Sequence, residues 1–333
     1  LNKLDKEAVP AFFQLVYYNV KGAALVNQMT LNAQKNRLYA SQKRSAANLL
    51  RSRVKAYGDS LEIITKRYNS LLNGKWQGMM SLIHGGARSF ERARTDSVSL
   101  SPVPTLGVSC EAADNMKGVS NVHVIPCFNK YLPQSYYVDV FNSGMGKLKW
   151  KAVPSDPWIL VNKKSGATYS EERINVSVDW SKVPVGESVS GSIDISSGSG
   201  EKQTVFVSVF NPETPSVEEL KGLYVENNGY VSIDATGFHR KREDANIKFD
   251  VVEGLGFDNK VMRLGDAFAK TPYLDGLILT SNYVAPVRGD KYPVLEYDFY
   301  SFQTGPVDVY TYMMPIFPLD NEHGSRYGVM VDN

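Results

Sequence analysis

Apolar residues between Leu50 and Leu71 recur with the spacing of a helix. Their steps alternate between four and three residues, at Leu50, Val54, Tyr57, Leu61, Ile64, Tyr68 and Leu71. This spacing places one apolar seam along one side of a helix. A matching set precedes it at Phe13, Val16, Val20, Ala24, Leu31 and Leu38. We predict two helices, over about residues 10–40 and from the serines at Ser41 or Ser45 to Leu72, that bury these faces against each other as an antiparallel pair.

The end of the second helix has a clear stop signal. Asn73-Gly74 is typical of a helix C-terminus. Beyond it, a short third helical piece is expected to cap the pair with its apolar residues, at Trp76, Met79, Met80 and Ile83. The first 94 residues are therefore predicted to form a helical bundle.

After about residue 95 the pattern changes from helical spacing to alternation. Val, Ser, Thr, Tyr, Gly and Pro become frequent, and about seven short apolar stretches between residues 106 and 212 are separated by turn residues. This is typical of an immunoglobulin-like β-sandwich. Trp158 and Trp180 follow the strand pattern, so filling the core is favoured over stacking on a sugar.

The whole chain is thus predicted to be multidomain, with an α-helical part followed by all-β parts. We expect a helical bundle (1–94), a linker (95–105), an immunoglobulin-like β-sandwich (106–212), a hinge (213–222) and a jelly-roll-like β-sandwich (223–333) truncated at its C-terminus. No apolar run approaches the roughly 20 residues of a membrane helix. No signal peptide is visible in the sequence, and both ends look like cuts within a longer protein.

Charge divides the chain unevenly. Residues 1–94 have 16 Lys and Arg against five Asp and Glu, whereas the rest has 21 against 30. The basic side chains are expected to form a solvated face of the helices, and they include Lys43, Arg44, Arg51, Arg53, Lys55, Lys66 and Arg67. Binding of nucleic acid rests on this charge alone and is disfavoured, whereas contact with an acidic domain or an anionic polymer stays open.

Metal and cofactor chemistry is not expected. The two cysteines, Cys110 and Cys127, are predicted to be free thiols or one incidental disulfide, and a metal site is disfavoured.

Four blocks of the helical part resemble one enzyme family. They are Ala11–Tyr18, Val20–Leu25, Ala33–Ala40 and Gly74–Trp76 with Met79-Met80. In this order they resemble the helical domain that follows the catalytic barrel of the family 115 α-glucuronidases. Three stretches of the last domain resemble the same family: Gly229–Ala235, Pro293–Phe302 and Arg326–Asp332.

The resemblance implies a C-terminal accessory part of an α-glucuronidase that removes (4-O-methyl)glucuronic acid side chains from xylan or a related plant polysaccharide. The catalytic carboxylates would then lie in an N-terminal catalytic domain outside this chain, which has no catalytic residues of its own. The implied partners are a plant polysaccharide like glucuronoxylan and that missing domain. A secreted or periplasmic location is implied, and homodimerisation stays open.

Candidate substrate-binding residues lie in the first helix, where Tyr17, Tyr18 and Lys21 share about one turn. The alternative is a structural role for the tyrosine pair. Gly22, beside them, has two interpretations: close packing where a side chain would clash, or close approach to a ligand or to the catalytic domain. In the last domain, Arg240 and Arg326 are weaker candidates for binding a carboxylate.

A second function class explains the same pattern. The chain would be a stand-alone carbohydrate-binding or adhesion protein without catalytic activity. A third class, nucleic-acid binding, depends only on the basic helices.

Overall fold

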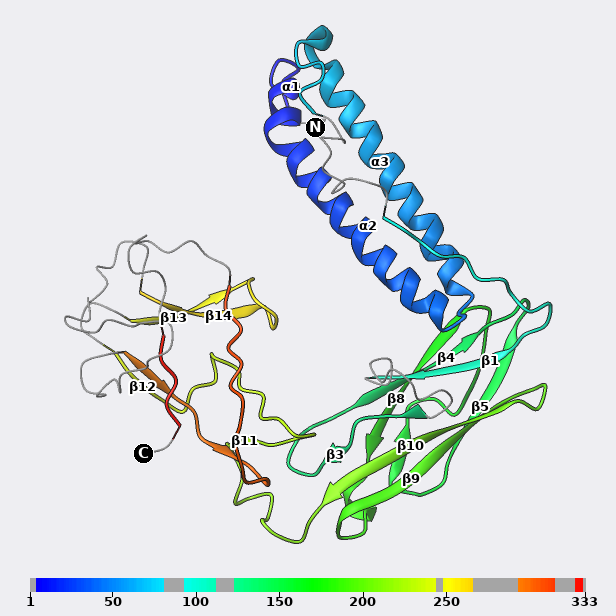
Figure 1. Ribbon diagram of the computed structural model, residues 1–333, viewed down its shortest axis with the longest axis vertical. Coiled ribbons are helices and arrows are strands. Elements are labelled where there is room, and N and C mark those ends of the chain that lie inside the picture. The colour runs from blue at the N-terminus through cyan, green and yellow to red at the C-terminus, as the bar shows by residue number, and fades with distance from the viewer. Residues whose placement is uncertain are drawn as a thin grey trace. The chain divides into compact units, whose positions relative to one another are not determined.

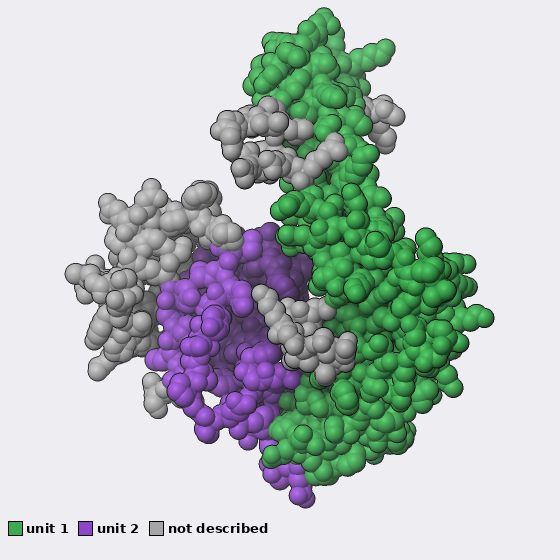
Figure 2. Space-filling view, turned by 45° about the vertical axis from the view of Figure 1, so that its right-hand side comes forward, with its two compact units in different colours: residues 1–212 green, residues 213–333 purple. Residues whose placement is uncertain are grey.

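The chain divides into two compact units, residues 1–212 and 213–333, which Figure 2 shows in green and purple. The computed structural model describes residues 4–80, 93–111, 123–243, 248–265, 293–314 and 327–331. In this part of the chain an N-terminal helical segment is followed by β-structure, so the predicted order of α then all-β is confirmed. Among these residues, no helix combines the length and the apolar character that crossing a membrane requires.

Two long helices lie side by side and antiparallel in the N-terminal unit (Figure 1). The first begins as α1 (Val9–Phe12), continues through one π-helical turn (Phe13–Tyr17) and becomes α2 (Tyr18–Ser41). The second is α3 (Ala46–Gly74). Pro10 stands in the first turn of the first helix, where its missing N–H costs no helical hydrogen bond. The two predicted helices are confirmed, and Ser45 takes the N-cap position of α3 without a capping side-chain bond.

The seam predicted on α3 is confirmed. Its buried residues include Leu50, Val54, Leu61, Ile64 and Tyr68. On the first helix the predicted face is wrong apart from Phe13. The buried residues there are Gly22, Leu25, Met29, Ala33, Asn36 and Tyr39. The first helix has apolar residues on two opposite sides, and hydrophobic spacing alone cannot choose between two sides that both suit a helix partner.

The predicted third helix is not present in the described residues. Trp76 and Met80 pack on the core of the helical pair as expected, but residues 75–79 form turns. The side chain of Asn69 donates to the carbonyl of Met80 at 2.7 Å and accepts from its N–H at 3.1 Å. This pair of hydrogen bonds folds the chain back on α3 without a helix. Ile83 lies outside the described residues.

Gly22 faces α3, but the structure contradicts a steric requirement for glycine at this position. A Cβ atom added to Gly22 would lie 3.9 Å from Leu61 Cδ1, which is ordinary van der Waals contact. Because glycine inside a helix costs about 0.5–1 kcal/mol relative to alanine, Gly22→Ala should stabilise the N-terminal unit by about that amount. Urea unfolding followed by tryptophan fluorescence measures it.

Gly107 offers the matched control for this substitution. A Cβ atom there would overlap the ring of Phe141, so Gly107→Ala should destabilise the same unit. A loss of stability in Gly22→Ala would contradict the packing derived for α2 and α3.

The β-structure of this unit forms two sheets. One has the strand order β1-β4-β8-β6 and the other β2-β10-β9-β5-β7, with β3 also paired to β10. β2 and β3 run parallel to β10, and the other neighbours are antiparallel. The strands are β1 (Leu106–Cys110), β2 (His123–Val124), β3 (Phe128–Asn129), β4 (Tyr136–Asn142), β5 (Leu148–Pro154), β6 (Ile159–Val161), β7 (Ser165–Thr168), β8 (Glu171–Val178), β9 (Gly186–Ser197) and β10 (Lys202–Asn211).

Both sheets contribute side chains to one hydrophobic core. Val140 of β4 and Val176 of β8 meet Ile195 of β9 and Val205 of β10 there, because alternate residues of each strand point to the same face. Trp158 is buried in this core and Trp180 packs against it, as the sequence predicted. Cys110 and Cys127 are not joined in a disulfide, and burial raises the pKa of the Cys127 thiol.

Two asparagines of the helical pair bind the segment that leads into β1. The side chain of Asn36 donates to the carbonyl of Asp96 at 3.1 Å and accepts from its N–H at 2.8 Å. Asn48 makes the same two bonds to Val98, at 2.9 and 3.0 Å. Each side-chain amide provides the donor and the acceptor that the backbone of a neighbouring strand would provide. The segment therefore runs along the helices in an extended form (Figure 1).

The C-terminal unit contains three two-stranded pairs among its described residues: β11 with β16, β12 with β15 and β13 with β14. The strands are β11 (Tyr224–Val225), β12 (Arg240–Arg242), β13 (Phe249–Glu253), β14 (Lys260–Leu264), β15 (Val294–Glu296) and β16 (Phe299–Tyr300). β11 and β16 are parallel, and the other two pairs are antiparallel.

Candidate functional site

The two tyrosines of the predicted site lie at the joint between the π-helical turn and α2. Tyr17 is half-buried and stacks on Phe13, with 5.2 Å between ring centroids. The Tyr18 ring packs on Tyr68 at 4.8 Å. Its hydroxyl shares a 3.1 Å hydrogen bond with Thr65. Both rings therefore have contacts within the helical pair, and the hydroxyl of Tyr18 is directed to α3.

Lys21, the third predicted residue, lies one turn further on and is exposed. It follows Tyr17 by four residues, so the two side chains are neighbours on the helix surface. No pattern in the sequence predicts the π-helical turn over Phe13–Tyr17. Single π turns inside α-helices are frequent at functional sites. The role of Tyr17, Tyr18 and Lys21 in binding sugar stays a prediction.

A buried arginine joins the turn between α2 and α3 to the first sheet. Arg44 is 2% exposed, which makes the predicted solvated position wrong for this residue. Its Nη1 lies 3.2 Å from Asp139 on β4 and 3.2 Å from Glu171 on β8. Its Nε donates to the side-chain oxygen of Gln42 at 2.5 Å. A buried guanidinium is stable only with such partners, so the sheet and the turn depend on each other.

Aromatic rings enclose this ion cluster. The guanidinium carbon of Arg44 lies 4.2 Å from the centroid of Tyr39 and 4.7 Å from that of Phe141. The Tyr39 hydroxyl donates to Glu171 at 3.1 Å. Burial, with the nearby charge of Glu171, raises the pKa of Tyr39 to about 12. Tyr39 therefore stays neutral and remains a donor at physiological pH.

A polar pocket opens beside the cluster, with a volume of about 460 Å³. Its walls come from the end of α2, from the turn and from three strands, and they are Gln34, Lys35, Leu38, Tyr39, Arg44, Ser109, Tyr137, Asp139 and Arg173. Arg173 donates to Asp139 at 2.8 and 3.1 Å and lies over the Tyr137 ring at 3.5 Å. The size is in the range of small-ligand sites, and Lys35, which has no carboxylate partner within the described residues, can pair with a carboxylate.

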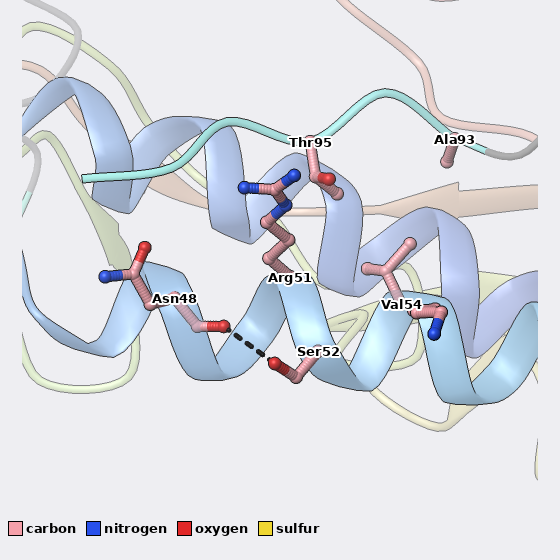
Figure 3. Close-up of a pocket in the computed structure, with 7 residues that line it drawn as sticks. Asn48, Arg51, Ser52, Val54, Ala93 and Thr95 are labelled. Atoms are coloured by element: carbon pink, nitrogen blue, oxygen red, sulfur yellow. Dashed lines mark hydrogen bonds between the residues drawn. The ribbon is translucent and has the colours of Figure 1, made fainter. Parts of the chain in front are cut away.

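A second pocket, of about 500 Å³, lies between α3 and the extended segment that precedes β1 (Figure 3). Arg51 and Lys55 line it one turn apart, together with Asn48, Ser52, Val54, Ala93 and Thr95. The hydroxyl of Ser52 is used within α3, where it donates to the carbonyl of Asn48 at 3.2 Å. The described lining carries two cations and no carboxylate, so it can hold an anion.

In the C-terminal unit, Arg240 is engaged by two acidic residues. Its Nε donates to Glu296 at 2.5 Å, and its two terminal nitrogens donate to Asp298 at 2.7 Å each. Such a bidentate pair uses the face that a carboxylate ligand would need. The predicted carboxylate-binding role of Arg240 is therefore wrong for this conformation. Arg326 lies outside the described residues.

Sequence reasoning missed the Arg44 cluster because its members are far apart along the chain. Asp139 and Glu171 follow Arg44 by 95 and 127 residues. No local spacing connects such positions. A signal existed only for Asp139, a carboxylate between apolar residues of a well-defined strand.

The comparisons with known proteins bear mainly on the C-terminal unit. Residues 223–333 match the sequence model of the glycosyl hydrolase family 115 C-terminal domain. This confirms the resemblance stated for the C-terminal portion of that family. No curated protein sequence matches the chain.

Similar solved structures are distant. A xyloglucanase of family GH5 from Bacteroides ovatus, in complex with a XXXG heptasaccharide, is 12% identical, with a TM-score of 0.25 over 37% of this chain and 22% of that chain. The human CEP192 PapD-like domain is 10% identical, with a TM-score of 0.26 over 41% and 99%. A FixG-related protein from Vibrio parahaemolyticus is 9% identical, with a TM-score of 0.23 over 34% and 98%. None of these likenesses carries an argument about function.

Proposed function

We propose that the chain is the accessory C-terminal part of an α-glucuronidase, because residues 223–333 match the sequence model of the family 115 glycosyl hydrolase C-terminal domain. The match to this domain is the observation that carries the proposal. The parent enzyme removes (4-O-methyl)glucuronic acid side chains from xylan or a related plant polysaccharide outside the cell. In this proposal the two-sheet part has the immunoglobulin-like fold, and the C-terminal unit has a jelly-roll-like fold.

The arrangement of acidic residues supports an accessory role for this chain. Glycoside hydrolysis ordinarily needs two carboxyl groups facing one bond, about 5 Å apart or about 6.5–9.5 Å apart. Within the described residues, Arg44 bridges Asp139 and Glu171, and Arg240 bridges Glu296 and Asp298. Each of these carboxylates is already paired with an arginine, which does not suit a pair of catalytic carboxyl groups that face one glycosidic bond. The catalytic carboxylates are then supplied by an N-terminal domain of the same protein.

Substrate contacts from this chain would come from the first helix. Tyr17 and Lys21 are neighbours on its surface, and Lys21 can pair with the carboxylate of a uronic acid. The hydroxyl of Tyr18 is hydrogen-bonded to Thr65 within the helical pair, so Tyr18 would hold the first helix on α3.

The test of the proposal is the activity of the complete protein that contains this chain. It should release uronic acid from glucuronoxylan, measured by chromatography of the soluble products. The same protein should release none from xylan without uronic acid branches. Binding to glucuronoxylan without any release would favour the stand-alone carbohydrate-binding protein instead.

A further inference from the structure

The first helix carries a second seam, on the side opposite to α3. Its members are Val16, Val20, Ala24, Asn27, Leu31 and Leu38, and we call them the outer seam. Gln34 completes the alternation of four-residue and three-residue steps between Leu31 and Leu38. This spacing continues over three heptads, which is typical of a helix that packs against two neighbours.

Apolar side chains of the outer seam are exposed. Val20 is 67% exposed and Leu31 is 62% exposed. Val16 and Leu38 are exposed at the two ends of the seam. Burial of such a row by a partner is favourable because it removes apolar surface from water. Its heptad spacing selects a helix as the partner, since a second helix can place side chains between these at the same repeat.

Asn27 stands in the middle of the outer seam and is exposed. Within the described residues its side chain makes no hydrogen bond in the structure. A single asparagine at such a position is a common device for fixing the register of a helix pair, at some cost in stability. An asparagine at this position therefore favours a specific helical partner over nonspecific apolar contact.

Charge selects the chemistry of the partner. From Ala8 to Gly58 the chain has no Asp or Glu and has eight Lys or Arg. Lys21, Lys35 and Arg37 belong to α2 and flank the outer seam. None of the three has a carboxylate partner within the described residues. A second copy of this helix would bring only cations to such an interface, whereas a helix with acidic flanks would pair with them.

The C-terminal end of the outer seam leads into the polar pocket. Leu38 belongs to both, and Gln34, Lys35 and Arg173 also line the pocket. A helix that follows the outer seam would therefore place acidic side chains beside these cations at its end.

We propose that the outer seam is the docking surface for an acidic amphipathic helix. Its apolar residues lie at heptad spacing against Val16, Val20, Leu31 and Leu38, and its carboxylates pair with the flanking cations. This inference goes beyond the proposed function, because it does not depend on which protein supplies the helix. An experiment that contradicts one of the two does not contradict the other.

The test uses two synthetic helical peptides of about four heptads, with leucine at the a and d positions. One has glutamate at the e and g positions, and the other has lysine there. Fluorescence anisotropy measures the binding of each labelled peptide to the whole chain at low and high salt. We expect the acidic peptide to bind at least about tenfold more tightly at low salt, with the difference reduced at high salt.

Two variants localise the binding. Leu31→Asp should weaken binding of the acidic peptide by about tenfold or more, because an aspartate would meet both apolar side chains and carboxylates. Ile63→Asp is the matched control, since Ile63 is 66% exposed on α3 and lies outside the outer seam. Unchanged tryptophan fluorescence shows that both variants fold.

Three results would overturn the proposal. The first is equal binding of the acidic and basic peptides, and the second is an equal effect of the two variants. The third is self-association of the chain, measured by sedimentation, that Leu31→Asp abolishes, because this would assign the outer seam to a second copy.

Discussion

Replacing Arg44 by alanine should destabilise the N-terminal unit by about 3–5 kcal/mol, which is the cost of breaking a buried ion pair by removing one partner. Arg44 and Asp139 are 2% and 5% exposed. Without the guanidinium, the Asp139 carboxylate keeps only the contact with Arg173, whose side chain is half-exposed. The variant also loses the contacts of Arg44 with the rings of Tyr39 and Phe141.

Tryptophan fluorescence isolates this effect, because all four tryptophans, at positions 76, 150, 158 and 180, belong to the N-terminal unit. Urea unfolding of Arg44→Ala is compared with that of Lys202→Met, which removes an ion pair that is well exposed on both sides. The control should change little. A double variant, Arg44→Met with Asp139→Asn, should recover part of the loss, because it leaves no unpaired buried charge. Equal stability of Arg44→Ala and the control would contradict the account of the cluster.

Replacing Glu226 by glutamine should loosen the turn after β16 in the C-terminal unit. The Glu226 carboxylate is 6% exposed and accepts hydrogen bonds from the chain that follows β16. They come from the Ser301 hydroxyl at 2.7 Å and from the N–H groups of Phe302 and Gln303 at 2.8 and 3.0 Å. Hydrogen bonds to a charged group contribute about 1.5–3 kcal/mol, so the amides of residues 302 and 303 should exchange about tenfold faster or more. Hydrogen–deuterium exchange with mass spectrometry measures this.

The same carboxylate predicts a pH dependence. Burial raises the pKa of Glu226, but the bonds from Ser301, Gln303 and Phe302 outweigh this and leave the pKa below its ordinary value. A lowered pKa in the folded state means that the stabilisation is complete above the unfolded value of about 4.3 and is lost as the pH falls through the folded value. Protection of residues 302 and 303 should therefore decrease below about pH 4 in the natural protein. Glu253→Gln is an exposed control on β13. At each pH its protection of residues 302 and 303 should equal that of the natural protein.

Local spacing predicted the helices and the main strands of the N-terminal unit. The seam of α3 is regular and has one apolar side, so its burial follows directly from its period. The strand from Tyr136 to Asn142 is β4 as expected. Trp158 was predicted in the core because its neighbours alternate like a strand.

Long-range partners explain what the sequence could not predict. The buried side of α2 includes Gly22 and Asn36, which no hydrophobic pattern selects. Asn36 is completely buried because its amide binds Asp96, 60 residues away. Arginine is a residue type usually found at the surface, and only the fold brings Asp139 close to Arg44. The site residues Tyr17 and Lys21 could be placed on one helix from sequence, but no local spacing relates them to a substrate.

The proposal on which the account depends is that residues 1–333 are the accessory part of an α-glucuronidase, with the catalytic groups supplied by another domain. The most direct test is the release of uronic acid from glucuronoxylan by the purified chain, compared with the complete protein at equal molar concentration. We expect release by the complete protein and none by the chain. Release by the chain alone would contradict the account.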